Sequence, residues 1–277
     1  MRRLKTARST ISAALKLAFV AVYTLPLIAV QEIALRTGWW GDRTVPQLWH
    51  RITLKVLGIR VVAKGEPAAG RPLLITSNHV SWTDILVLGS MMGVHFVAKA
   101  EVRGWPIMGT FARLQRSVFV ERERRRASPE QAREIAARLT DGDPMVLFAE
   151  GTTGEGSRVL PFKSTLFGAA QLALEAMETD CVLVQPVAIA YMRRNGLPLD
   201  RRERGRIAWI GDMDFVPHVK ELLKAGAIDV EVHYGKPIPF STQSNRKKVA
   251  RAAECAVRDL LTDVLYGCKS QIGRADA

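Results

Sequence analysis

Short β-branched segments alternate with longer helical ones after Gly58, and this alternation limits what the chain can fold into. Short apolar runs are typical of buried strands, and longer amphipathic stretches are typical of helices that cover a sheet. The pattern predicts an α/β domain with a mixed, largely parallel sheet flanked by helices. The expected strands are 59–62, 73–76, 95–98, 117–120, 145–149, 182–188, 207–210 and 230–234. The expected helices are 84–92, 106–114, 128–140, 166–177, 216–224 and 246–265.

Residues 1–58 differ from this pattern and are predicted to form membrane-anchoring helices, ahead of the α/β domain over 59–266 and a flexible tail over 267–277. The stretch from Leu17 to Val30 carries no charge. As a helix it would extend about 21 Å, short of the roughly 30 Å hydrocarbon core of a bilayer. Basic residues flank it on both sides, so we expect a helix that lies in, or dips into, one leaflet. A full crossing and a secretory signal peptide are the alternatives.

Tryptophans and a second amphipathic stretch extend the membrane-associated pattern. Trp39, Trp40 and Trp49 have the amphipathic rings that settle at membrane interfaces. The segment 45–57 has an apolar face and a basic side, which predicts a helix on the membrane surface. The alternative is a helix that packs on the protein's own core.

The chain is strongly basic, with a formal net charge of +13. Such a charge implies an anionic partner, either a nucleic acid or an anionic membrane surface. No nucleic-acid-binding signature is present, and basic residues adjoin apolar helical segments, so we expect an anionic membrane surface and no nucleic acid. Cys181, Cys255 and Cys268 lack the spacing of a zinc site or a disulfide framework, which fits a reducing cytosol.

His79 is the main candidate for chemistry, because it lies where an apolar strand gives way to a helix. Asp84 follows five residues later, about one turn into the helix, from where its carboxylate can reach back to the imidazole. A histidine oriented by a carboxylate is a general-base arrangement that can deprotonate a hydroxyl. The pattern alone is also compatible with a purely structural contact. The other histidines have no comparable partner pattern and are expected at the interface, in packing or on the surface: His50, His95, His218 and His233.

Two further segments carry candidate chemistry. Glu150, Gly151 and Thr152 begin a glycine-rich turn after a strand, where backbone N–H groups can face an anion or a developing oxyanion. The turn lacks the Lys-Ser/Thr ending of a nucleotide-binding loop. Arg122 follows another apolar strand, and its guanidinium suits phosphate binding. Read singly, the turn is compatible with a structural role and Arg122 with an ordinary surface position.

Together these segments resemble the four motifs of the 1-acylglycerol-3-phosphate acyltransferase family, in the family's order, over about residues 73–190. Asn-His-Val-Ser-Trp-Thr-Asp at 78–84 is similar to the first motif, 119–122 to the second, 148–153 to the third and 184–189 to the fourth. The resemblance makes 59–266 a catalytic domain and implies that His79 is the general base and that Asp84 orients it. It further implies that lysolipid is bound by Asn78, Lys99, Arg122, Glu150, Gly151 and Thr152, and that Pro186 shapes the acyl-donor site.

The implied reaction is direct acyl transfer from an acyl carrier protein or acyl-CoA thioester to a lysolipid hydroxyl, with no metal or other cofactor. The glycine-rich turn at Gly151 would stabilise the oxyanion. The expected location is the bacterial inner membrane, with the active site at its cytoplasmic face.

Lysophosphatidate is the acceptor expected from the family, but the chain departs from the family's third motif. Ala149 replaces a usual proline, and Thr153 stands where many members carry a phosphate-binding arginine, which Arg158 or Lys163 would have to replace. Lyso-ornithine lipid, an acceptor without phosphate, is therefore the alternative. A non-catalytic membrane-binding scaffold is a remoter one.

Overall fold

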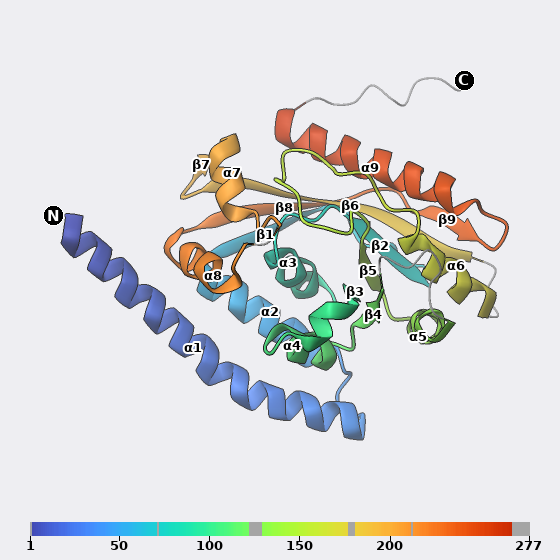
Figure 1. Cartoon of the computed structure of the whole chain (residues 1–277), viewed down its shortest axis with the longest axis horizontal. Helices are drawn as coiled ribbons and strands as arrows, with labels where there is room; N and C mark the ends of the chain where they lie inside the picture. Colours follow the sequence, from blue (N-terminus) through green and yellow to red (C-terminus); the bar gives the residue numbers. More distant parts are fainter. Residues whose placement is uncertain (1, 71, 122–128, 177–180, 212, 268–277) are drawn as a thin grey trace.

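A mixed nine-stranded sheet with helices on both faces forms the centre of the protein (Figure 1). The structure is a computed structural model, and it describes residues 2–70, 72–121, 129–176, 181–211 and 213–267. The strand order is β1-β8-β6-β2-β5-β3-β4, with β7 and β9 paired to β6. The strands are β1 (Ile59–Lys64), β2 (Leu73–Ser77), β3 (His95–Lys99), β4 (Val118–Val120), β5 (Met145–Phe148), β6 (Cys181–Arg194), β7 (Leu197–Pro198), β8 (Ile228–Tyr234) and β9 (Ile238–Ser241). The predicted α/β class is confirmed.

The helices divide the core into two layers. On one face α5 (Pro129–Thr140), α6 (Leu166–Ala176) and α9 (Arg246–Tyr266) bury side chains against the sheet, and on the other α2 (Thr44–Leu57), α3 (Thr83–Met91), α7 (Arg201–Ile207) and α8 (Phe215–Lys224) do so. The 3₁₀ helix η1 (Ala100–Gly104) and α4 (Met108–Leu114) lie between β3 and β4 along the chain. Because side chains alternate along a strand, Leu74 faces the first layer while Leu73 and Ile75 face the second.

Strand β6 is the longest in the sheet, and it changes partners along its length. It runs parallel to β2, while its other edge pairs antiparallel first with β9 through 181–184 and then with β8 through 187–194. Pro186 lies between these two pairings. Its lack of an N–H therefore breaks no ladder bond, which explains a proline inside a central strand.

The N-terminal region is a pair of helices beside the sheet domain. Helix α1 (Arg2–Thr37) runs along the outside of the molecule and contacts α2, α4 and α8 (Figure 1). Residues Ile11–Thr37 form one helix long and apolar enough to cross a membrane, and only 11% of its most apolar window is buried in the protein. The helix therefore extends well beyond residues 17–30, the uncharged segment on which the expected length of the helix was based. Length no longer argues against a full crossing.

Helix α2 packs one face on the body of the protein and leaves another open. His50, Leu54 and Leu57 are buried, mainly against α3, so His50 is a core residue rather than the interfacial one expected. Burial lowers the pKa of His50 to about 4, which keeps the ring neutral. Leu48 stays exposed, so part of the predicted surface-facing side remains.

The predicted strand at 207–210 is wrong. Helix α7 covers Arg201–Ile207 instead, and its N-terminus is capped by Asp200, whose side chain accepts a hydrogen bond from the backbone of Glu203 at 2.7 Å. The apolar run after it lies in a bend outside the sheet, where Trp209 donates its backbone N–H to Val80 O at 2.9 Å. Strand β9, which contains Pro239, was not predicted.

Candidate active site

His79 and Asp84 lie at the junction of β2 and α3, as their spacing predicted. The Nδ1 atom of His79 is 2.8 Å from Asp84 Oδ2, so Nδ1–H donates to the carboxylate and Nε2 is left as the acceptor. The same Oδ2 accepts hydrogen bonds from the backbone N–H groups of Val80 at 2.6 Å and Ser81 at 2.9 Å. Asp84 has no exposed surface, whereas the His79 side chain is 15% exposed. The geometry presents one basic nitrogen at the protein surface.

The imidazole of His79 is also held by stacking. Its ring lies 3.9 Å from that of Phe148, at the end of β5, with the two planes 12° apart. The neighbouring Asn78 is turned inward: its side chain donates to Ile189 O at 2.9 Å and accepts from Ile189 N at 2.8 Å. Asn78 thus links β2 to β6, and the structure does not bring it to the exposed part of the site, where it was expected to bind lipid.

The glycine-rich turn after β5 is fastened to the His79 loop. Gly154 donates its backbone N–H to His79 O at 2.7 Å, and Gly156 lies so close to Val80 that a Cβ there would meet Val80 Cγ1 at 2.9 Å. Gly151 has φ 73°, a left-handed conformation that glycine adopts without strain. Thr153 donates its hydroxyl to Trp209 O. The structure therefore brings the segments of the first and third motifs into contact.

Glu150 is a buried carboxyl group in this turn. Loss of hydration raises its pKa to about 8, although hydrogen bonds from Leu160 and His79 oppose the shift. Its Oε1 accepts from Leu160 N at 3.2 Å, while no residue in the described part of the chain bonds to Oε2. At neutral pH the group is mostly protonated, so it ties the following loop to the turn without adding a negative charge.

Lys163 brings a cation to the turn. A Cβ on Gly151 would lie 3.1 Å from Lys163 Nζ, so the ammonium group sits over this glycine. The loop that carries Lys163 is held by backbone bonds from Lys163 N to Ala149 O at 2.8 Å and from Phe162 N to the buried Glu254 at 2.9 Å. Within the described residues, no carboxylate pairs with Lys163, whereas Lys99, at the end of β3, lies 3.5 Å from Glu101. Arg122 lies outside the described residues.

Tyr191 is the residue of this site that the motifs did not predict. It lies in β6, fully buried, and its hydroxyl donates to Asp84 Oδ1 at 2.7 Å. One signal was present in the sequence. A tyrosine inside the apolar run 187–192 needs a polar partner for its hydroxyl, and such partners are few in a core.

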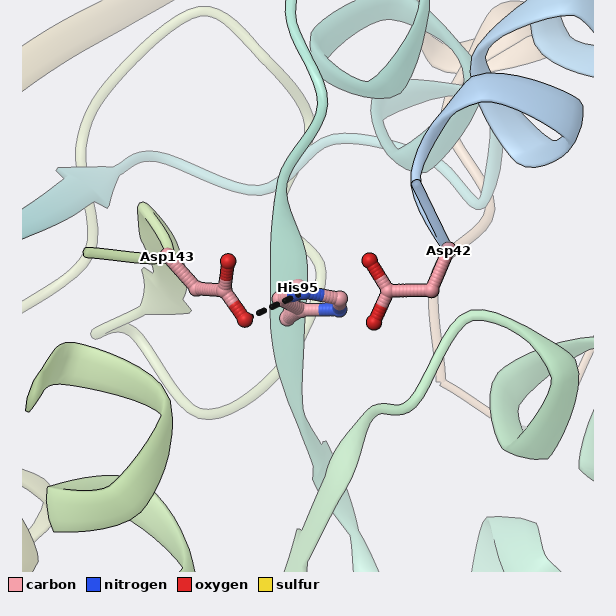
Figure 2. Close-up of side chains that lie close together, drawn as sticks. All are labelled: Asp42, His95 and Asp143. Atoms are coloured by element: carbon pink, nitrogen blue, oxygen red, sulfur yellow. Dashed lines mark ion pairs between the residues drawn. The ribbon is translucent and has the colours of Figure 1, made fainter. Parts of the chain in front are cut away.

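A second polar cluster joins the α1–α2 connection to the sheet. Asp42, His95 and Asp143 point their side chains toward one another, with the His95 ring between the two carboxylates (Figure 2). His95 Nε2 is 3.0 Å from Asp143 Oδ2, so a carboxylate partner was missed for this histidine. Arg43 lies 3.0 Å from Asp143, and Arg116 pairs with Asp42.

Three metal-type ligands meet in this cluster, but its charges already balance. Each carboxylate has its own arginine, so a divalent cation would have to displace both guanidinium groups. The cluster is therefore best described as an ion-pair network. It fastens the N-terminal helices to β3 and to the corner after α4, where Arg116 adopts a positive φ of 53°.

The ion-pair network should stabilise the fold. Asp143→Asn removes a buried charge partner of His95 and Arg43, and we expect a loss of about 3 kcal/mol in the free energy of unfolding, measured by urea titration of detergent-solubilised protein. The control is Asp229→Asn, which breaks a pair with the exposed Arg60 and should cost less than about 1 kcal/mol. Equal losses in the two variants would contradict the assignment.

Glu150 should make stability depend on pH. A carboxyl group whose pKa is higher in the folded state stabilises the fold fully below its unfolded value of 4.5, and this stabilisation is lost as the pH rises through about 8. The Tm of the wild type should therefore fall further than the Tm of Glu150→Gln between about pH 5 and pH 9. Parallel Tm curves for the two proteins would show that Glu150 ionises normally.

Known proteins share this fold and this site region. Residues 55–190 match the Acyltransferase family. Lyso-ornithine lipid O-acyltransferase of Brucella abortus is 48% identical over 260 residues, covering 93% of this chain and 97% of the relative. The enzyme of the same name from Rhizobium meliloti is 45% identical over 248 residues, covering 90% and 85%. The 1-acyl-sn-glycerol-3-phosphate acyltransferase of Neisseria gonorrhoeae is 35% identical over 108 residues, only 38% of this chain and 42% of that protein.

The fold is also that of a solved structure. The crystal structure of the 1-acyl-sn-glycerophosphate (LPA) acyltransferase PlsC from Thermotoga maritima superposes with a TM-score of 0.62 and 19% identity, covering 96% of this chain and 98% of that one. At this identity the likeness shows the fold. With the near full-length relatives, it places the chain in the PlsC-like acyltransferase family, and the protein is an acyltransferase.

Proposed function

We propose that the protein is a membrane-bound O-acyltransferase that moves a fatty acyl group from a thioester to the hydroxyl of lyso-ornithine lipid. The observation that carries this proposal is the similarity to lyso-ornithine lipid O-acyltransferases along nearly the whole chain. The sequence similarity to the 1-acyl-sn-glycerol-3-phosphate acyltransferase of Neisseria gonorrhoeae covers less than half of either protein. These relatives support the acceptor that the sequence offered as an alternative better than lysophosphatidate, its leading expectation.

In the proposed mechanism His79 Nε2 takes the proton of the acceptor hydroxyl as the oxygen attacks the thioester carbonyl. Asp84 holds the ring in the tautomer that leaves Nε2 free and stabilises the imidazolium that forms. When the tetrahedral intermediate collapses, the carbon–sulfur bond breaks and the thiol leaves with the proton from His79. The products are the acylated lipid and free carrier thiol, so the enzyme needs no covalent intermediate.

The oxyanion role expected at Gly151 needs an adjustment. Gly151 N already donates to Phe148 O at 3.1 Å, and Gly154 N donates to His79 O. Thr152 and Thr153 lie between them, and their backbone N–H groups make no hydrogen bond to the described part of the chain. We assign the oxyanion to these two N–H groups, which lie in the turn that is hydrogen-bonded to His79 O.

The head group of the acceptor is assigned to Lys163. Ornithine acylated on its α-nitrogen keeps a carboxylate, and Lys163 offers an ammonium over the turn that pairs with no carboxylate among the described residues. Thr153 supplies no charge, and its hydroxyl is bonded to Trp209 O. Its substitution for the family's arginine therefore suits an acceptor that lacks phosphate.

The N-terminal helices are proposed to hold the catalytic domain on the cytoplasmic face of the inner membrane. Helix α1 exposes a long apolar surface, and Trp39 is 76% exposed at its end. Further exposed apolar side chains lie at Trp105 and Ile107, which precede α4, and at Met213 and Val216, around the start of α8, and α1 contacts both of these helices. A site on such a surface can take lipid from the bilayer and an acyl carrier protein or acyl-CoA thioester from the cytosol.

The acceptor can be tested directly. Purified protein in detergent receives radiolabelled acyl carrier protein thioester with lyso-ornithine lipid or lysophosphatidate in separate reactions. We expect label in ornithine lipid and a rate loss of about a hundred- to ten-thousand-fold in His79→Ala. Label in phosphatidate alone would refute the acceptor, and undiminished transfer by His79→Ala would refute the mechanism.

Lys163 should determine the affinity for the head group. Lys163→Gln is expected to raise KM for lyso-ornithine lipid about tenfold, because one charge-assisted contact is lost, with kcat within about twofold. Lys163→Arg should restore most of the affinity. Lys248→Gln is the matched control, since it removes one exposed lysine on α9. An unchanged KM in Lys163→Gln would mean that the carboxylate binds elsewhere.

A further inference from the structure

The Asp84 carboxylate receives hydrogen bonds on both of its oxygens. Three donors share Oδ2, namely His79 Nδ1 and the backbone N–H groups of Val80 and Ser81. Oδ1 receives the hydroxyl of Tyr191 at 2.7 Å. The donors on Oδ2 come from the loop that carries His79, whereas Tyr191 comes from β6, more than a hundred residues farther along the chain.

The direction of these bonds follows from proton counting. The Tyr191 oxygen lies 2.6 Å from Thr83 Oγ1 and 2.7 Å from Asp84 Oδ1. An ionised carboxylate only accepts, and a phenol has one hydrogen, so Tyr191 donates to Asp84 and accepts from Thr83. Burial and the nearby Asp84 charge raise the pKa of Tyr191 well above its usual range, so the phenol keeps this proton.

Tyr191 is itself held rigidly. It is 1% exposed, and it pairs with Val230 of β8. The two oxygens of a carboxylate exchange places when the group rotates, and a donor on each side opposes this rotation. The strand therefore supplies a fixed second point that the short 79–84 loop cannot supply alone.

We propose that Tyr191 is a positioning residue for acyl transfer, which holds the Asp84 carboxylate so that Oδ2 faces His79 Nδ1 and keeps Nε2 directed at the acceptor hydroxyl. The proposal rests on the proposed role of His79 as the base. Thr83 completes the relay by orienting the Tyr191 hydroxyl. Removing the phenol oxygen would leave Oδ1 buried without a donor and free the carboxylate to turn.

The test is Tyr191→Phe, assayed with lyso-ornithine lipid across pH. We expect kcat to fall about ten- to a hundredfold with KM within about twofold, as for other groups that orient a reacting side chain. The acid limb of the kcat profile should move to higher pH, because a carboxylate with one donor fewer holds the protonated imidazole more strongly. Thr83→Val should shift both quantities in the same direction by a smaller amount.

Tyr234→Phe is the matched control. Tyr234 is a partly buried tyrosine in the adjacent strand β8, and its hydroxyl contacts Met91 Sδ at 3.8 Å rather than Asp84. It should leave kcat and the pH profile unchanged. A folded Tyr191→Phe protein with wild-type kcat and an unmoved acid limb would overturn the proposal, as would a lower Tm with no change in the acid limb.

Parallel reactions separate this inference from the proposed function. If His79→Ala loses activity while Tyr191→Phe keeps wild-type kcat and an unmoved acid limb, only the role of Tyr191 is refuted. Full activity in His79→Ala would refute the base and, with it, the positioning role. If the wild type uses only lysophosphatidate, the same variants assayed with that acceptor still decide the role of Tyr191.

Discussion

A carboxylate with no exposed surface requires donors around it, and the hydrogen bonds to Asp84 meet this requirement by joining distant parts of the chain. The loop after β2 supplies two backbone N–H groups and the imidazole, and β6 supplies a phenol. The glycine-rich turn after β5 then attaches to the same loop through His79 O. The site therefore depends on the parallel arrangement of β5, β2 and β6, which places these segments next to one another.

Few other negative charges compete with the buried Asp84 carboxylate for positive or hydrogen-bonding partners. Glu150, in the turn, is close enough to interact with the charge of Asp84, and its raised pKa keeps it mostly neutral. Lys163 then stands over the turn without a carboxylate partner among the described residues. A thioester reaction passes through an oxyanion and an imidazolium, and such surroundings favour both. The same surroundings would attract an acidic head group.

Much of the fold followed from the local pattern, and its errors have physical causes. Strands β2, β4 and β5 were predicted to within about one residue at each end, because every residue in them is buried and the sequence shows a continuous apolar run. The run at 207–210 failed because apolar residues in a bend have the same composition as a short strand, and β9 was hidden by Pro239. His79 and Asp84 are separated by five residues, so their contact was predictable. The contacts of Tyr191 with Asp84 and of His95 with Asp143 join residues far apart in the chain, and no local spacing encodes them.

The central claim is that His79 acts directly on the acceptor hydroxyl of lyso-ornithine lipid. The most direct test is an experimental structure of the protein with this lipid and a non-hydrolysable thioester analogue bound. The account predicts the acceptor oxygen within about 3 Å of His79 Nε2, with the thioester oxygen facing the turn at Thr152 and Thr153. A hydroxyl bound more than about 6 Å from His79, beyond the reach of one bridging water, would contradict it.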